Sequence, residues 1–142
     1  LTGPPLRGRR VPPHAYCLPV VKPERHRLAL RKAATSGSGK YFLGTDSAPH
    51  AQSAKEADWG CAGIFNAPNA LESCAAVFEE EGALDRLEAF ASEYGPQFYG
   101  LPLNEGTVTL ERGETLVPGS IDANGTPVVP FHAGERLGWR LR

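Results

Sequence analysis

The chain carries an aspartate and a histidine directly after a short apolar run. Tyr41-Phe42-Leu43 leads into a loop that contains Asp46 and His50. In parallel α/β folds the catalytic groups gather where strands end and loops begin. The pattern therefore predicts a strand-end site with Asp46 as its acid and His50 beside it on the loop, because Pro49 disfavours a helix that would join them. A turn or helix-cap role is the alternative for a lone aspartate at this place.

A glycine-bounded segment follows this loop. Gly60 and Gly63 enclose Cys61 and Ala62, and glycine lets a backbone approach a ligand closely. A plain flexible turn is the alternative interpretation. The other histidines show no spacing typical of metal ligands: His14, His26 and His132.

The elements that would position the loop are predicted in the order strand, helix, strand. Ala15–Leu18 is a short apolar segment halted by Pro19, and Lys40–Thr45 is the next predicted strand. Between them, Pro23 suits the first turn of an amphipathic helix through Lys32, whose apolar face consists of Leu28, Leu30, Ala33 and Ala34. This order predicts parallel strands joined by a right-handed crossover.

Two more helices are predicted after the loop. Asn66 is the expected cap of a helix that stops at Gly82, with apolar positions at Leu71, Ala75 and Phe78. The acidic end of this helix, Glu79–Glu81, opposes the helix dipole, so we expect it to be solvated or paired with positive side chains. A third helix is expected over Leu84–Glu93, with Gly95-Pro96 as its stop.

The rest of the chain, from about residue 106, is predicted to form strands and turns. Alternating or short apolar segments predict strands at Thr107–Glu111, at Val128-Val129 and at Gly138–Leu141. The chain contains no internal repeat.

Composition bounds the class of protein. The 142 residues are 41% hydrophobic and 22% charged, which predicts one soluble globular domain. No apolar run or leader suits a membrane span or a signal peptide, and the net charge of −1 does not call for nucleic acid. Three cysteines fit neither a disulfide framework nor a Cys-x-x-Cys site, which favours a reducing cytoplasm. The absence of methionine and the start at Leu1 favour a piece of a longer protein.

Several separate motifs resemble the C-terminal part of dihydroorotase of the bacterial, homodimeric type, in the amidohydrolase superfamily. They occur in the family's order and cover nearly the whole chain. The motifs are Tyr16–Lys22, Lys40–His50, Gly60–Pro68, Gly95–Pro102, Val129–Phe131 and Gly138-Trp139.

The resemblance implies a fold and a reaction. The fold would be the last two strands and helices of a metal-dependent hydrolase (β/α)8 TIM barrel, with residues of about 15–105 forming the barrel end and site loops and about 106–142 a C-terminal strand and turn extension. All of 1–142 would be one incomplete domain. The reaction would be the reversible interconversion of N-carbamoyl-L-aspartate and dihydroorotate in pyrimidine biosynthesis, in a cytoplasmic homodimer.

The resemblance also implies roles for particular residues. Asp46 matches an aspartate that ligates zinc and moves the proton to the leaving nitrogen. His50 matches a histidine that binds the substrate carboxylate, and Ala62 matches a residue whose backbone holds the same end of the substrate. Leu18 matches a residue whose main chain meets the pyrimidine ring. The loop 51–59 is expected to be variable surface without a role.

Much of the implied site would lie outside this chain. The family binds two zinc ions per subunit through a His-x-His pair, a carboxylated lysine and two further histidines, all expected upstream of Leu1. A barrel typically needs about 250 residues, so we expect the isolated chain to be inactive and to expose apolar surface. Two alternatives stay open: a truncated, non-catalytic partner of a full-length subunit, and a sister cyclic amidohydrolase such as dihydropyrimidinase or allantoinase.

Overall fold

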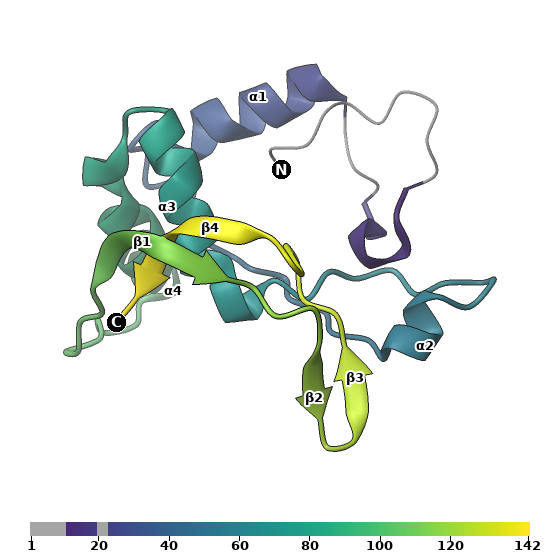
Figure 1. The fold of residues 1–142 in the computed structure, drawn as a ribbon. Helices are drawn as coiled ribbons and strands as arrows, with labels where there is room; N and C mark the ends of the chain where they lie inside the picture. The colour runs from purple at the N-terminus through teal and green to yellow at the C-terminus, as the bar shows by residue number, and fades with distance from the viewer. Residues whose placement is uncertain (1–10, 20–22) are drawn as a thin grey trace.

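The computed structural model describes residues 11–19 and 23–142. Helices dominate the first two thirds, and two antiparallel strand pairs follow (Figure 1). The predicted motif segment Val20–Lys22 lies outside the described residues. In order, the elements are η1 (Pro13–Ala15), α1 (Glu24–Ala34), α2 (Gln52–Lys55), η2 (Ala67–Asn69), α3 (Ala70–Glu80), η3 (Leu84–Arg86), η4 (Ala89–Glu93), α4 (Tyr94–Tyr99), β1 (Leu110–Leu116), β2 (Ile121–Ala123), β3 (Thr126–Val128) and β4 (Arg136–Leu141).

Helix α1 confirms the predicted amphipathic helix, with Pro23 as its N-cap. Its apolar face is not covered, however. None of its residues is buried, and Leu28 and Leu30 are 50% and 65% exposed. Other large apolar side chains share this exposure: Tyr41, Phe98, Tyr99, Leu101 and Leu103. The described residues therefore bury only part of the apolar surface that the sequence provides.

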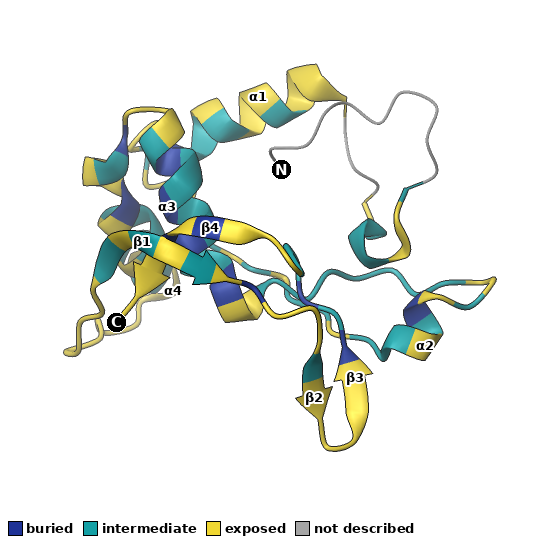
Figure 2. Ribbon diagram, in the orientation of Figure 1, coloured by how far each residue is buried: buried dark blue, intermediate teal, exposed yellow. Residues whose placement is uncertain are grey.

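The hydrophobic core forms where α3 meets strand β4. Ala75 and Phe78 of α3 pack with Trp139 of β4 and with two residues from the following turn and helix, Ala83 and Leu87. Figure 2 shows dark, buried segments on both α3 and β4 at this crossing. The Phe78 and Phe90 rings also pack at a centroid distance of 5.2 Å. The strand pair β1–β4 therefore packs on one face of α3.

The start of α3 differs from the prediction. Asn69, not Asn66, is its N-cap. Asn66 precedes the short turn η2, and its side-chain amide donates to the carbonyl oxygen of Thr45 (2.8 Å). The side chain that would cap a helix is therefore used to hold a neighbouring segment.

The acidic end of α3 is paired, as predicted. Arg31 of α1 forms ion pairs with Glu80 and Glu81, each at 2.7 Å. Glu79 pairs with Arg112 and accepts a hydrogen bond from the Trp139 indole N–H (2.9 Å). These cations offset the unfavourable position of the carboxylates at the helix C-terminus.

The third predicted helix is present in broken form and runs further than expected. It passes from η3 through the π-helical turn η4 into α4, so Gly95-Pro96 is not its stop. Pro96 is tolerated because it lies in the first turn of α4, just after the π-helical turn, where its missing N–H is not required. The helix ends at Gly100, which adopts a left-handed conformation with φ of +65°.

The tail contains four short strands. β1 pairs antiparallel with β4, with a register shift between Arg112 and Thr115, and β2 pairs with β3. The prediction at 138–141 is confirmed by β4 and the one at 128 by β3, whereas β1 begins three residues later than the predicted strand. The hairpin β2–β3 turns at Asn124-Gly125, both with positive φ. Such an Asn-Gly pair is a hairpin signal in sequence, and the prediction of strands in the tail made no use of it.

The two strands predicted before the site are not assigned as strands. Ala15 ends η1, and neither the rest of 15–18 nor 40–45 carries a strand assignment. A strand needs a neighbour along its whole length, whereas here Leu43 donates one backbone bond to Phe90 (3.0 Å) and Ser47 forms one isolated parallel bridge with Ile64. This bridge joins residues outside the two predicted strands, and the predicted parallel ladder between them is absent from the described residues.

No helix in the described part of the chain is both long and apolar enough to cross a lipid bilayer.

Candidate functional site

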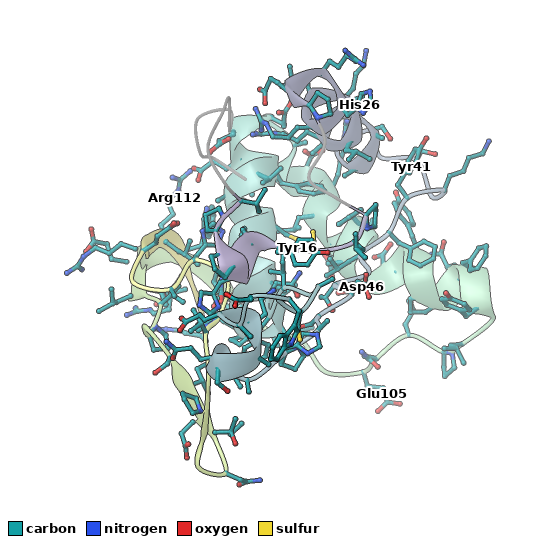
Figure 3. All side chains as sticks on the ribbon, turned by 90° about the vertical axis from the view of Figure 1, so that its right-hand side faces the viewer. Tyr16, His26, Tyr41, Asp46, Glu105 and Arg112 are labelled. Carbon is teal, nitrogen blue, oxygen red and sulfur yellow. The ribbon has the colours of Figure 1, made fainter. Side chains whose placement is uncertain are left out.

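A cavity of about 390 Å³ lies between three segments that are distant in the sequence. Three of the four predicted site residues line it: Leu18, Asp46 and Ala62. The other lining residues are Cys17, Pro19, Thr45, Ala48, Gly63, Ile64 and Asn66. Figure 3 labels Asp46 and also Tyr16, the residue that precedes the first of these segments.

Single backbone hydrogen bonds hold the three segments side by side. Ala48 donates to the carbonyl oxygen of Ile64 (3.0 Å) next to the parallel bridge between Ser47 and Ile64. Gly63 donates to the carbonyl oxygen of Tyr16 (2.9 Å). The segment around Ala62 therefore lies between the other two and is bonded to both.

Asp46 is exposed and adopts a positive φ of +44°. Few residues other than glycine adopt this conformation, although aspartate tolerates it better than most. The bond from Asn66 to the carbonyl oxygen of Thr45 fixes the backbone immediately before it. Strained backbone that is held by its surroundings is common at functional sites, and it presents this carboxylate at the cavity wall.

His50 joins the site through Ala62. With Nε2 protonated, the half-buried His50 ring donates to the carbonyl oxygen of Ala62 at 3.0 Å. His50 does not itself line the cavity in the described residues. All four predicted site residues are nevertheless brought together, three around the cavity and the fourth bonded to its wall.

Gly63 has a clear steric requirement. Its φ is +148°, and an added Cβ would come within 2.7 Å of the Ala48 carbonyl oxygen and 2.9 Å of the His50 ring. Only glycine therefore allows this segment to approach the His50 loop so closely. A plain flexible turn therefore does not account for Gly63, where close packing excludes any larger residue.

Lys55 contributes to the site although the sequence did not predict it. It ends helix α2 inside the loop that was predicted to be surface without a role, yet it is only 5% exposed. Its ammonium donates to carbonyl oxygens on both sides of Ala62. Nothing in the polar composition of 51–59 distinguishes this lysine from its exposed neighbours, so the prediction of a role-free surface loop was wrong at this residue.

A metal centre would need more ligands than the described residues bring together. The described residues contain no cluster of three or more His, Cys, Asp or Glu side chains able to hold a metal ion. Zinc takes carboxylate oxygen readily but requires three or four protein ligands. Asp46 is thus a suitable single donor, and the described residues do not fit a metal on their own.

Comparisons with known proteins point to one family. No family model matches the chain. The chain is 70% identical over 129 residues to dihydroorotase from Sphingopyxis alaskensis and 67% identical over 129 residues to dihydroorotase from Novosphingobium aromaticivorans, in each case over 91% of this chain. The chain is similar to one portion of these dihydroorotases. It spans about 37% of the length of these relatives.

Solved dihydroorotases have the same fold over this region. The enzyme from Saccharomyces cerevisiae in complex with 5-fluoroorotic acid matches with a TM-score of 0.85 and 35% identity, over 92% of this chain and 37% of that chain. The enzyme from Campylobacter jejuni matches with a TM-score of 0.81 and 36% identity, over 95% of this chain and 39% of that chain. The predicted fold, the C-terminal part of a dihydroorotase, is confirmed.

The strands predicted before the site lack a continuous neighbour in the described residues. Only single backbone bonds reach them, such as that from Leu43 to Phe90. Because a strand is defined by a ladder of bonds to its neighbour, these segments are not assigned as strands.

Proposed function

We propose that the protein of which this chain is a portion is a dihydroorotase that interconverts dihydroorotate and N-carbamoyl-L-aspartate. In the hydrolytic direction, water adds to the ring carbonyl carbon, the C–N bond breaks and the nitrogen takes up a proton. The identity of 65–70% to three dihydroorotases over about nine tenths of the chain carries this proposal. The ligand of the Saccharomyces cerevisiae relative, 5-fluoroorotic acid, is a carboxylated pyrimidine and supports the substrate class.

Asp46 is proposed as the acid–base group and as one metal ligand. Its exposed carboxylate at the cavity wall can take a proton from the attacking oxygen and deliver it to the leaving nitrogen. Zinc, when bound, would supply activation of water and polarisation of the carbonyl. Its other ligands, and the zinc dependence itself, belong to the complete protein and are part of the proposal.

The other three residues are proposed to hold the substrate. Ala62 and His50 would receive the carboxylate, and the main chain at Leu18 would meet the ring. Their placement around and against one cavity supports this assignment. The hydrogen bond between His50 and Ala62 supports placing both residues at the same end of the substrate.

Assembly and location are part of the same proposal. We expect a cytoplasmic homodimer of complete chains that acts on a small molecule and neither binds nucleic acid nor inserts into membranes. The division at about residue 105 between barrel end and extension also stays a prediction. The isolated 142-residue chain is expected to be inactive and prone to association through its exposed apolar side chains, among them Leu30 and Phe98.

The decisive test uses the complete protein that contains this sequence. Purified protein loaded with zinc should convert dihydroorotate to N-carbamoyl-L-aspartate, and Asp46→Asn should lower kcat by at least about 100-fold. Asp58→Asn, an exposed aspartate outside the cavity, is the matched control and should leave kcat unchanged. Turnover of hydantoin or allantoin in place of dihydroorotate would reassign the protein to a sister amidohydrolase. Inactivity of the zinc-loaded complete protein would leave a non-catalytic partner role as the better account.

A further inference from the structure

Lys55 is a buried cation whose hydrogen-bonding capacity is used in full. An ammonium group has three donors, and Lys55 Nζ donates to the carbonyl oxygens of Tyr16 (2.9 Å), Cys61 (2.7 Å) and Gly63 (2.7 Å). The Tyr16 ring lies 5.8 Å away. Burying a charge costs free energy unless the charge is hydrogen-bonded. The three hydrogen bonds of Lys55 offset this cost.

The three acceptors belong to the walls of the candidate site. Tyr16 lies two residues before Leu18, and Cys61 and Gly63 flank Ala62 on both sides. The same ammonium therefore ties the segment that carries Leu18 to the segment that carries Ala62. Gly63 reinforces the link because its N–H donates to the carbonyl oxygen of Tyr16 as well.

This arrangement fixes the direction of the Ala62 N–H. The carbonyl of Cys61 and the N–H of Ala62 belong to one peptide unit, and in a trans peptide they point in opposite directions. With the Cys61 oxygen held by Lys55, the Ala62 N–H points away from the ammonium. The Ala62 carbonyl is bonded to His50, whereas the hydrogen bonds of the described residues include none from the Ala62 N–H.

The ammonium also strengthens that donor. A hydrogen bond to the carbonyl of a peptide unit polarises the unit and makes its N–H a better donor, and bonds to a charged group do so most. An N–H without a protein partner, on a residue that lines a cavity, is suited to an anionic group of a ligand. Lys55 is thus placed to orient and polarise the Ala62 N–H so that it can bind an anion.

We propose that Lys55 is a positioning residue for the carboxylate end of the substrate: it holds and polarises the Cys61–Ala62 peptide so that the Ala62 N–H, together with His50, receives the carboxylate. This inference rests on the proposed dihydroorotase function and assigns it a further residue. Burial lowers the pKa of Lys55, and thiolate charge at Cys61 or Cys17 would act in the opposite direction. The three carbonyl oxygens that accept hydrogen bonds from the Lys55 ammonium favour its charged form.

The test replaces Lys55 in the complete, zinc-loaded protein. Lys55→Met keeps an unbranched side chain of similar length and removes all three donors. We expect KM for dihydroorotate to rise by at least about tenfold while kcat falls by less than about threefold, since the reacting bond is not contacted by Lys55. Lys32→Met, at an exposed lysine on α1, is the control and should leave both constants unchanged.

A coupled variant separates positioning from general loss of structure. If Lys55 acts through the carboxylate site, the KM effects of Lys55→Met and His50→Ala should be non-additive, the double variant being little worse than His50→Ala alone. Additive effects, or a fall in kcat with KM unchanged, would overturn the proposal. So would a KM within twofold of wild type in a Lys55→Met protein of normal melting temperature and zinc content.

Two further measurements cover a variant that does not fold. Lys55→Gln retains a neutral donor and should give a smaller rise in KM than Lys55→Met would. In the wild-type protein, the Gly63 amide, which donates to Tyr16, should be strongly protected from hydrogen exchange, and exchange at the rate of an open loop would contradict the joining of the two segments that Lys55 is proposed to hold. Failure of the wild type to turn over dihydroorotate would instead refute the proposed function itself, which keeps the two failures distinguishable.

Discussion

Replacing Gly63 by alanine tests the close packing on which the candidate site depends. The added Cβ would lie 2.7 Å from the Ala48 carbonyl oxygen, 2.8 Å from the Ala48 Cβ and 2.9 Å from the His50 ring. Ordinary contacts begin at 3.4 Å. The segments must therefore separate by roughly 0.5–0.7 Å, and the nearest movable group is the His50 ring.

The size of the effect follows from two contributions. The φ of +148° is one that alanine rarely adopts, and such strain costs about 1–3 kcal/mol of folding stability. A displacement of about 1 Å in a site can cost about 100-fold in rate, so the shift of His50 should lower kcat/KM by about 10- to 100-fold. That loss corresponds to about 1.4–2.7 kcal/mol of transition-state stabilisation.

The assay is steady-state hydrolysis of dihydroorotate by the complete protein, together with its thermal unfolding. Gly82→Ala is the matched control for backbone strain, because Gly82 also has a positive φ of +65° but a Cβ added there would meet nothing within 4 Å. Gly106→Ala, with ordinary φ and open space, is the control for the substitution itself. A Gly63→Ala protein with kcat/KM within twofold of wild type would refute the steric reasoning.

Three other outcomes follow from the structure. Phe78→Ala should destabilise the fold by about 3–5 kcal/mol, measured by urea unfolding, because Phe78 is 2% exposed at the centre of the core; a loss below about 1 kcal/mol would contradict the described core. Cys74 should react with iodoacetamide much more slowly in the native than in the urea-unfolded chain, since burial raises the pKa of its thiol, and equal rates would argue against that burial. The hydrogen bond from His14, and after it the one from Gln52, lowers the pKa of Glu56 below 4.5. The resulting stabilisation of the fold is present above the unfolded pKa and is lost as the pH falls through the lower folded pKa, so the wild type should lose more stability than Glu56→Gln between about pH 6 and about pH 3. Equal losses in the two proteins would contradict this reasoning.

Part of the candidate site could be predicted from local signals. Asp46 and His50 follow an apolar run and were singled out from their immediate neighbours, whereas Leu18 and Ala62 were assigned only through the resemblance to dihydroorotase. The structure adds that Leu18, Asp46 and Ala62 line one cavity. The roles of these residues stay predictions until the complete protein is assayed.

Features that depend on distant contacts could not be predicted. Lys55 reads as one polar residue among several, and its burial depends on the Tyr16 carbonyl, 39 positions away. The continuous strands expected before the site depend on a neighbour along their whole length, and the described residues supply only single bonds there. The helix ending at Gly100 was set too short because Pro96 was treated as a stop, whereas the π-helical turn before it accommodates the proline.

The hairpin β2–β3 offers an attachment point for probes. Its turn at Asn124-Gly125 is exposed, while Val128 anchors its base in the interior with 5% exposure. Figure 1 shows the hairpin projecting from the rest of the molecule, and exposed tips of this kind tolerate insertions best. Strand β3 also contacts α2. A fluorophore attached at the turn would leave the cavity untouched and would report movements of the helix that carries Lys55.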